Sequence, residues 1–454
     1  MASGLSGIGS LKEEREKDFQ SNSLDFEPLE YSANYDSWHL QKIYPLVYPN
    51  VDQENCQHTF EIGSEHDNNY IDLREIYANV SFRVTTTDDI ALTSADTNVS
   101  VVDNIDHSLF SSIDVFINGN LVSDHGKESS LRNYVTNLVS TSEQTKKTHL
   151  AANHWTFDKE NARKTIEKDS FDIANKPKHE KELTARAKIL TEEVPCYFQP
   201  QFDLMTCGKL LPAGNTLKLN FEMAHSDFLL LVPEATSPTD KSYKIRITSF
   251  TLEVKRCVPN KIALRHVEEA KKTRMCFPIT RTTIRPFQVL QGQHTVTIPR
   301  IVDPVQLPYQ LLVIPIENYQ FKKQNQNPYI WDSCGIEKAN LVLNGLSMPQ
   351  APLELFHRNR VYKIVMNALG HNELTGTSCG VSPYQWQNSK FFLAFDLAGC
   401  GCAGGHNHRP VSGDLQLHVT FSSAPTAPIS LYVVACFENT ISILDKTVTL
   451  DYTV

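Results

Sequence analysis

The residues best suited to chemistry lie in one short segment near the C-terminus, residues 399–409, which read GCGCAGGHNHR. Cys400, Cys402, His406 and His408 fall within this segment, and zinc in proteins is commonly bound by Cys and His. Their spacing departs from that of a standard zinc finger, in which the Cys and His pairs stand further apart. We therefore expect a glycine-rich loop that joins two strands and holds no metal.

The rest of the sequence gives little sign of catalysis. It has no phosphate-cradling G-x-x-x-x-G-K and no H-E-x-x-H, and its G-x-S-like segments fall in predicted loops rather than at a strand-to-helix elbow. We expect structural roles for His107 and His225, and a buried thiol at Cys436 in an apolar strand. The prediction is a protein that is not an enzyme, with no catalytic residue, no cofactor-binding residue, no metal ligand and no cofactor.

Charge and composition narrow the class further. The chain has 454 residues and a net charge of −9, which argues against a general nucleic-acid coat because such coats need clustered Lys and Arg. Residues 1–54 carry more Asp and Glu than Lys and Arg, and we expect an arm that does not hold a genome. We expect the Trp and Tyr residues at 31–48 to pack beneath the neighbouring domain rather than to stack on bases.

No apolar run at the start reads as a secretory signal, and no stretch approaches the roughly 20 apolar residues that cross a bilayer. The ten Cys show no disulfide framework, so reduced thiols in cytoplasm or nucleus are expected.

The elements that must position these residues are short strands. Segments such as TLKLNFEM (216–223) and GDLQLHVTF (413–421) alternate apolar and polar residues, as strands buried on one face do. Long polar loops separate them, which favours a β-sandwich over alternating β and α. Residues 143–189 are dense in charge and poor in β-branched residues, so we expect surface helix and loop there, with solvated Lys and Arg.

The strand pattern occurs twice. Asn118-Gly119 follows IDVFI, and Asn344-Gly345 follows NLVL, and each Asn-Gly pair predicts a tight hairpin. Phe202-Asp203-Leu204 and Phe395-Asp396-Leu397 each precede a further strand pattern. The hairpin and the FDL motif stand further apart in the first copy, which is therefore shorter at its start or longer in its middle. The charged block lies between these markers, which indicates an insertion in the first of two tandem β-domains.

Several of these segments together resemble a known family. NYIDLREIYANVSFRV (69–84), HSLFSSIDVFINGNLVS (107–123) and NPYIWDSCGIEKANLVLNGLSMP (327–349), followed by FDL, GDLQLHVTF and ISLYVVACFENTISI, resemble the double-jelly-roll major capsid protein of Polinton/Maverick elements and adintoviruses. The resemblance runs in order from about residue 55 to the end. It is weakest in residues 1–54, the charged block and the loop at 400–408.

The resemblance implies an all-β fold of two tandem eight-stranded jelly rolls with a helix and loop insertion in the first. It also implies a homotrimer that forms a pseudo-hexameric capsomer of an icosahedral shell, a single-jelly-roll penton or minor capsid protein as partner, no sequence-specific nucleic-acid binding, and assembly in the host nucleus. The expected division is arm 1–54, first jelly roll 55–257 with the insertion at about 143–189, linker 258–275, second jelly roll 276–444 and tail 445–454.

Two other functions stay open on the sequence: a β-sandwich module that binds a receptor or a carbohydrate, and a host-domesticated capsid-like protein. The binding module would need aromatic residues concentrated in loops. Here the aromatic residues lie mainly in strand patterns. A host-domesticated capsid-like protein would share all the features above. An enzyme on a sandwich fold lacks a motif to support it.

Overall fold

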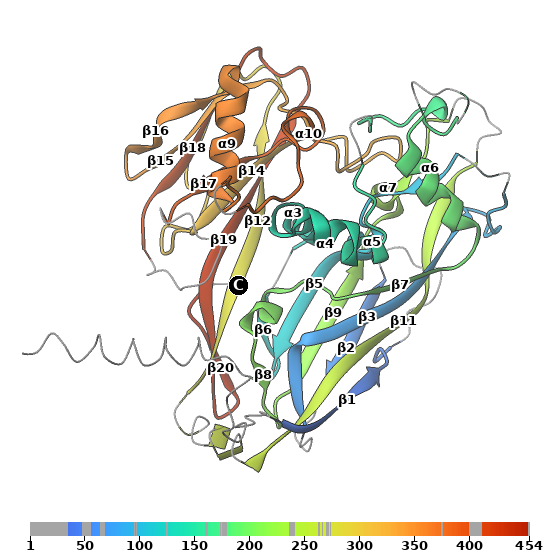
Figure 1. Ribbon diagram of the computed structural model, residues 1–454, viewed down its shortest axis with the longest axis vertical. Helices are drawn as coiled ribbons and strands as arrows, with labels where there is room; N and C mark the ends of the chain where they lie inside the picture. The colour runs from blue at the N-terminus through green and yellow to red at the C-terminus, as the bar shows by residue number, and fades with distance from the viewer. Residues whose placement is uncertain are drawn as a thin grey trace, which may run out of the picture.

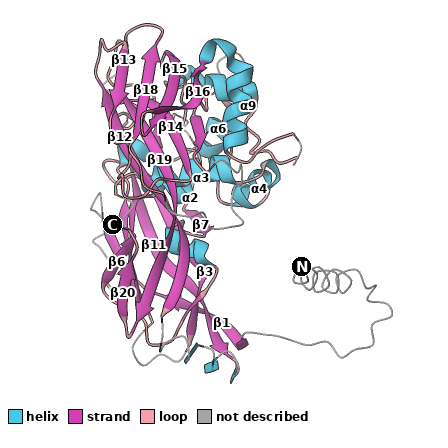
Figure 2. Ribbon diagram, turned by 90° about the vertical axis from the view of Figure 1, so that its left-hand side faces the viewer, coloured by secondary structure: helices cyan, strands magenta, loops and turns pink. Residues whose placement is uncertain are grey.

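The computed structural model describes residues 35–47, 56–63, 69–94, 96, 98–123, 126–158, 162–172, 174, 179–235, 241–261, 264–265, 267–268, 272, 274–373, 376–398 and 411–452. Two β-sandwiches stand side by side with helices α3 (Ser129–Ser140) and α4 (Glu143–Lys147) between them (Figure 1). The strands run along the length of the molecule, and most helices gather in its upper half (Figure 2).

The first sandwich consists of two four-stranded antiparallel sheets, in the orders β1-β11-β3-β7 and β2-β9-β5-β6. Their bounds are β1 Tyr35–Ile43, β2 Gln57–Ile62, β3 Tyr70–Thr86, β5 Phe110–Ile117, β6 Asn120–Ser123, β7 Val194–Phe198, β9 Leu217–Met223 and β11 Tyr243–Pro259. Three short strands add to this frame: β4 Ser100–Val101 pairs with β10 Leu230–Leu231, and β8 Leu210–Leu211 pairs with β3.

The second sandwich repeats the same strand order, β12-β19-β14-β17 and β13-β18-β15-β16. Its strands are β12 Met275–Val289, β13 Thr295–Ile298, β14 Gln310–Glu317, β15 Ile336–Leu343, β16 Leu346–Glu354, β17 Leu393–Asp396, β18 Leu415–Phe421 and β19 Ile429–Leu444. Read in chain order, each of the eight strands has a counterpart at the same place in the first sandwich. This is the predicted fold, two tandem eight-stranded jelly rolls, and it is confirmed.

The helices lie mainly in the connections between strands. Those of the first sandwich are α2 Ile105–Ser108, α3, α4, α5 His149–Ala152, η1 Lys168–Ser170, α6 Lys181–Lys188, η2 Ile189–Thr191, η3 Asp203–Cys207 and α7 Ser226–Leu229. Those of the second are η4 Leu355–His357, α9 Arg358–Ala368 and α10 Pro383–Asn388.

Equivalent strands bury equivalent faces. β9 and β18 both bury every second residue, from Leu217 to Met223 and from Leu415 to Phe421. In the first sandwich these side chains join an aromatic cluster in which Phe60, Phe110, Phe221 and Phe250 contact one another at centroid distances of 4.7 to 5.8 Å. In the second, the buried face of β18 carries Leu415, Leu417, Val419 and Phe421. The apolar residues of the alternating sequence pattern therefore face the core, and the polar residues face outward.

The two Asn-Gly hairpins occupy equivalent positions, β5–β6 and β15–β16. Asn118 and Asn344 both have φ 50°, and the following glycines have φ 80° and 84°, as a two-residue turn of this hand requires. Each Asn also fixes the next strand. Asn118 Oδ1 accepts from Thr216 N–H at 3.0 Å, and Asn344 Oδ1 accepts from Asp414 N–H at 2.9 Å. The same side chain thus shapes the turn and anchors the start of β9 or β18.

The connection after this hairpin differs most between the copies. It runs from 124 to 193 in the first sandwich and from 355 to 392 in the second, so the first is nearly twice as long. The extra length lies where the sequence predicts an insertion. The FDL motifs themselves are not equivalent, since Phe395 lies in β17 whereas Phe202 lies beyond the end of β7.

Two expected boundaries need correction. Residues 35–43 of the predicted arm form β1, an edge strand paired with β11, so the first sandwich begins before residue 55. Residues 1–34 lie outside the described residues. Within the predicted tail, β20 (Thr447–Leu450) pairs with β19. The strands β11 and β12 leave residues 260–274 between the sandwiches, within the predicted linker.

Candidate functional site: the junction between the sandwiches

The residues predicted to matter for chemistry are not brought together. The segment with Cys400, Cys402, His406 and His408 falls outside the described residues. His107 is buried and its ring packs against Phe198 at 4.9 Å. His225 caps the start of α7, where its Nδ1 accepts from Asp227 N–H at 3.2 Å.

A cysteine and a short serine-containing segment bear on the prediction that the protein is not an enzyme. Cys436 is half-buried in β19, and burial raises the pKa of its thiol to about 11. Residues 376–380 read GTSCG and so match G-x-S-x-G, the nucleophile pattern of α/β-hydrolases. They follow α9 in a loop rather than ending a strand, and Ser378 Oγ accepts from Gly380 N–H at 3.0 Å. The sharp strand-to-helix turn that would expose a nucleophile is therefore missing at this segment.

The best-built polar site lies where the two sandwiches meet. Tyr134 of α3 stacks on Tyr329 of the second sandwich with ring centroids 3.8 Å apart. Lys390 Nζ donates to Tyr134 Oη at 2.6 Å and to the Tyr329 carbonyl at 2.8 Å. All three side chains are fully buried, and Trp331 packs edge-on against Tyr134. This contact joins side chains from distant parts of the sequence.

A buried charge cluster adjoins these rings. Arg186 Nη1 donates to Asp158 Oδ1 at 2.7 Å, and Asn327 Nδ2 of the second sandwich donates to Asp158 Oδ2 at 3.0 Å. Burial alone would raise the pKa of Asp158, but Arg186 and Lys390 outweigh it and lower that pKa. Burial and the charge of Asp158 raise the pKa of nearby Asp103. Each buried charge in the cluster is thus balanced by one of opposite sign. Removing one partner would leave an unpaired buried charge and lower the stability of the fold.

The insertion carries part of this junction. Its backbone pairs with the second sandwich, since Ile166 N–H donates to the Asn325 carbonyl at 2.8 Å and Asn327 N–H donates to the Lys164 carbonyl at 2.7 Å. Lys164 Nζ also forms ion pairs with Asp332 at 2.9 Å and with Glu317 at 3.3 Å.

The expectation of solvated Lys and Arg in this block is therefore wrong for several residues. The Lys146 side chain is buried, with Nζ donating to the Leu138 carbonyl at 2.5 Å and to the Cys379 carbonyl, and burial lowers its pKa to about 8. Arg186 is also buried. Lys146 and Lys164 find oxygen partners on the second sandwich, whereas Arg186 finds its partners within the first.

The junction also covers one edge strand. β12 lies at the end of its sheet, and η3 of the first sandwich packs along it. Thr206 Oγ1 accepts from Thr280 N–H at 2.8 Å, Asp203 Oδ1 accepts from Thr282 N–H at 3.3 Å, and Lys209 Nζ donates to the Cys276 carbonyl at 2.8 Å. The backbone groups of an exposed edge are thus satisfied by the neighbouring sandwich.

The counterparts of these covered elements are open. β1 corresponds to β12, yet its residues 36–42 are all exposed. Trp38, Leu40, Tyr44, Leu46 and Val47 form what we call the β1 apolar strip, with 49 to 70% of each residue exposed. The prediction that the Trp and Tyr residues here pack under a neighbouring domain is therefore wrong for Trp38 and Tyr44. Their rings instead lie under Lys255 and Lys42, at 5.4 and 5.8 Å.

The helices follow the same contrast. Ten of the twelve residues of α3 are buried, whereas its counterpart α9 buries only Val361, Val365 and Met366. The outer side of α9 presents Arg358, Asn359, Arg360 and Lys363 to solvent. Within one chain, α3 of the first sandwich is thus buried at the junction, whereas the outer side of α9 in the second sandwich has no such contact.

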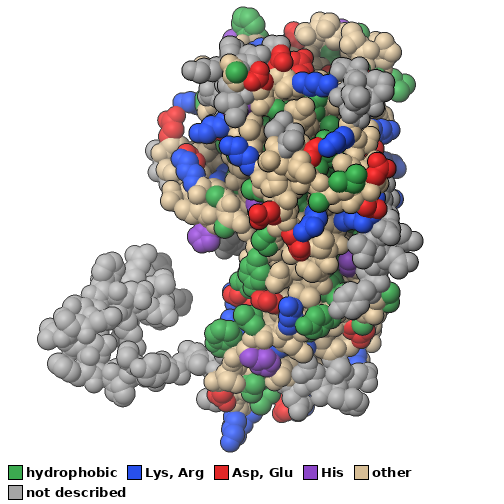
Figure 3. Space-filling model, turned by 90° about the vertical axis from the view of Figure 1, so that its right-hand side faces the viewer, with side chains coloured by type: hydrophobic (Ala, Val, Ile, Leu, Met, Phe, Trp, Pro, Cys, Tyr) green, Lys and Arg blue, Asp and Glu red, His purple; other side chains and the backbone are tan. Residues whose placement is uncertain are grey.

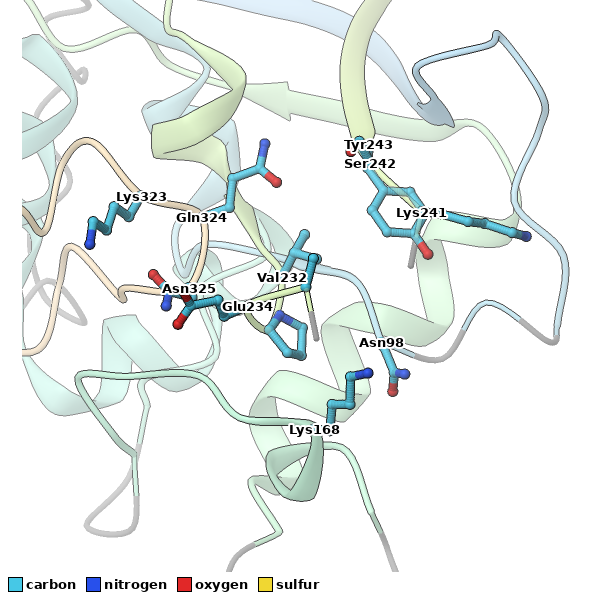
Figure 4. Close-up of a pocket in the computed structure, with 12 residues that line it drawn as sticks. Asn98, Lys168, Val232, Glu234, Lys241, Ser242, Tyr243, Lys323, Gln324 and Asn325 are labelled. Carbon is cyan, nitrogen blue, oxygen red and sulfur yellow. The ribbon is translucent and has the colours of Figure 1, made fainter. Parts of the chain in front are cut away.

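A cavity of about 370 Å³ opens beside the junction. It is bordered by Lys168, Lys241 and Lys323, from three separate segments (Figure 4). The ammonium groups of Lys241 and Lys323 point to opposite sides, and Lys241 Nζ pairs with Asp96 at 2.6 Å. The lysines therefore do not converge on a common point, as an anion site would require.

The outer face of the first sandwich mixes Lys and Arg with Asp and Glu, and hydrophobic side chains are scattered over its lower half (Figure 3). The side chains of the described residues on this face form no broad patch of one charge of the kind that binds a nucleic-acid backbone. Among the described residues, every helix is too short or too polar to span a bilayer.

Sequence reasoning did not find the junction residues. Tyr134 and Lys390 belong to no motif, Tyr329 and Trp331 lie in a quoted segment that assigned them no role, and contacts between distant segments leave no local period. The one available signal was a Tyr and a Trp close together in NPYIW, a segment between two strand patterns.

Comparison with known proteins bears on the fold. No family model matches the sequence, and no curated protein matches it. Solved structures do match over nearly the whole chain. A chain in the structure of the Sputnik virophage has a TM-score of 0.61 at 14% identity, covering 96% of this chain and 92% of that one.

Two others agree. A chain of the PBCV-1 virus capsid has a TM-score of 0.57 at 12% identity, covering 95% of this chain and 100% of that one. The mavirus major capsid protein has a TM-score of 0.53 at 11% identity, covering 97% and 94%. At these identities the likeness establishes the fold: this chain has the double-jelly-roll architecture found in viral major capsid proteins.

Proposed function

We propose that this protein is a major capsid subunit, a structural protein that acts by self-assembly without catalysis. One observation carries the proposal: two sandwiches of identical strand order are joined side by side through a buried junction. A receptor-binding or enzymatic sandwich has no need of a second copy held in this way. The match to virus capsid chains over both sandwiches supports the same role.

The finer proposal is a homotrimer that forms a pseudo-hexameric capsomer. If six similar sandwiches close into a ring, each contact within a chain is repeated between chains. Within the chain, the first sandwich covers β12 and buries α3. The repeat of that contact would cover β1 of one subunit and bury the outer side of α9 of the next. Both surfaces are exposed in the single chain, which supports the ring.

We further propose that the subunit belongs to a Polinton-like or adintovirus-like element. A single-jelly-roll penton protein would be its partner, and assembly would take place in the nucleus. The negative net charge favours a shell that forms without sequence-specific nucleic-acid binding. We also propose a division of the chain into a first sandwich ending near residue 259, a connection at 260–274 and a second sandwich starting near 275.

Light scattering on nuclease-treated protein at moderate salt tests the trimer. We expect three times the chain mass of 51.3 kDa at micromolar concentration, and larger shells by electron microscopy. Each subunit contact should bury about 2,000 Å² or more, as obligate interfaces do. A stable monomer, or a trimer that dissociates when nucleic acid is removed, would contradict the proposal.

Variants of the β1 apolar strip locate the contact. Trp38→Asp with Leu40→Asp should give a folded monomer, because both side chains are already exposed in the single chain. Leu290→Asp is the matched control, since Leu290 is 62% exposed but lies in the β12–β13 turn, away from β1. If the strip variant remains a trimer, the subunits meet through another surface.

A further inference from the structure

Three potential metal ligands converge at a point that the junction does not use. Asp106 of α2, His154 just after α5, and Cys196 of β7 each offer one ligand atom, and these atoms lie within 4.8 Å of one another. His154 Nδ1 lies 2.7 Å from Asp106 Oδ1. The ligands come from three elements that are separated in sequence, so the fold assembles the group.

The carboxylate is unusual in its burial. The Asp106 side chain is fully buried, and its Oδ2 has no hydrogen-bond partner among the described residues. A buried carboxylate oxygen without a partner costs free energy, and native structures rarely retain one without a reason. A cation at this point would supply the missing partner.

The chemistry of the group selects the cation. A thiolate, an imidazole and a carboxylate are all ligands that zinc accepts, whereas calcium and magnesium prefer oxygen alone. Thiolate and neutral imidazole are the forms of Cys and His that bind zinc, so zinc binding at this site should weaken as the pH falls.

We propose that Asp106, His154 and Cys196 form a zinc site with three protein ligands and solvent in the fourth position. The His154 side chain is 25% exposed and provides the path of entry. The ion would fasten the middle of the long connection after β6 to β7 and α2 of the first sandwich. The proposal concerns a different place from residues 399–409 and does not depend on the capsid role.

The test uses the full-length chain carrying Cys400→Ser and Cys402→Ser, which removes the thiols of the other candidate segment. After chelator treatment and titration with zinc, we expect one zinc per chain by elemental analysis. Cobalt in place of zinc should give the intense thiolate-to-metal absorption that only a bound sulfur produces. A folded parent that binds no stoichiometric zinc would overturn the proposal.

Single variants on that background assign the ligands. His154→Gln and Cys196→Ser should each weaken zinc binding by about 100-fold or more, and Cys196→Ser should also abolish the sulfur absorption. Cys257→Ser is the matched control, since Cys257 is likewise buried in a strand of the same sandwich and should leave both readouts unchanged. Because His154 is partly exposed, His154→Gln should fold even if Cys196→Ser does not. Zinc binding unaffected by His154→Gln would overturn the assignment.

Discussion

The first and second sandwiches share a frame and differ in what they attach to it. Eight strands pair in the same order in both, and both turn at an Asn-Gly pair. The connection that follows is nearly twice as long in the first as in the second, and the longer one reaches across to its neighbour. The comparison teaches that the sheets determine the fold, whereas the connections determine what each sandwich contacts.

The largest expected effect tests the contact that the longer connection makes with the second sandwich. Lys390→Met should lower the free energy of unfolding by about 3–5 kcal/mol, because it leaves Tyr134 Oη and the Tyr329 carbonyl without their donor and removes one of the two cations that lower the pKa of Asp158. Urea denaturation measures the change. Lys322→Met is the control, since Lys322 is exposed on the same sandwich. A loss below about 1 kcal/mol would mean that the junction adds little to stability.

The two hairpins offer the next test. Asn344→Ala should cost about 2 kcal/mol, from the lost bond to Asp414 N–H and the positive φ that Ala tolerates poorly. Asn118→Ala should cost about 1 kcal/mol more, because Asn118 Nδ2 also donates to Asn215 Oδ1 at 2.8 Å and to the Lys446 carbonyl at 3.1 Å.

Replacement by Gly separates the two contributions, because Gly keeps the positive φ but removes the side-chain bonds. Both Gly variants should therefore lie between the wild type and the corresponding Ala variant in urea denaturation. Equal losses at the two Ala positions would show that the additional bonds of Asn118 do not contribute.

Low pH should destabilise the first sandwich, by less than the substitutions above. Burial lowers the pKa of His107 from 6.5 to about 4, so the folded state stays neutral where the unfolded state takes up a proton. Stability is then fully present above pH 6.5 and is lost as the pH falls toward 4. Between pH 7 and 5 the loss should reach about 2 kcal/mol at most.

His107→Phe keeps the ring beside Phe198 and should flatten this dependence. The measurement is the free energy of unfolding at pH 7 and pH 5 for both proteins. His58, whose pKa burial also lowers to about 4, should leave a residual slope in the variant. An unchanged slope in His107→Phe would locate the acid sensitivity elsewhere.

The smallest effect is expected on the shorter connection. Lys363 of α9 pairs with Glu373 at 2.7 Å, but both side chains are well exposed. Lys363→Ala should leave the thermal midpoint unchanged, whereas Lys146→Met in the longer connection should lower it. A drop in midpoint for Lys363→Ala would indicate that α9 is less solvated than its exposure suggests.

The sequence allowed most of the sheet frame to be predicted, because half-buried strands leave a period of two. β9 and β18 are examples, since every second residue faces the core. β1 was missed because an edge strand with neither face covered in one chain has no such period. The junction was missed for another reason: Lys390 and Tyr134 meet only after both sandwiches have formed, and neither segment carries a trace of the other.

The asparagine of each hairpin has a consequence for how the sheets find their alignment. Because side chains alternate between faces, a shift of one residue between β5 and β9 would turn the entire core set outward. Asn118 bonds Thr216 through both its backbone N–H and its side chain, and Asn344 does the same with Asp414. A shifted pairing would break both bonds at once, so one residue at the tip of each turn acts as a check on the register of a strand that follows much later in the chain.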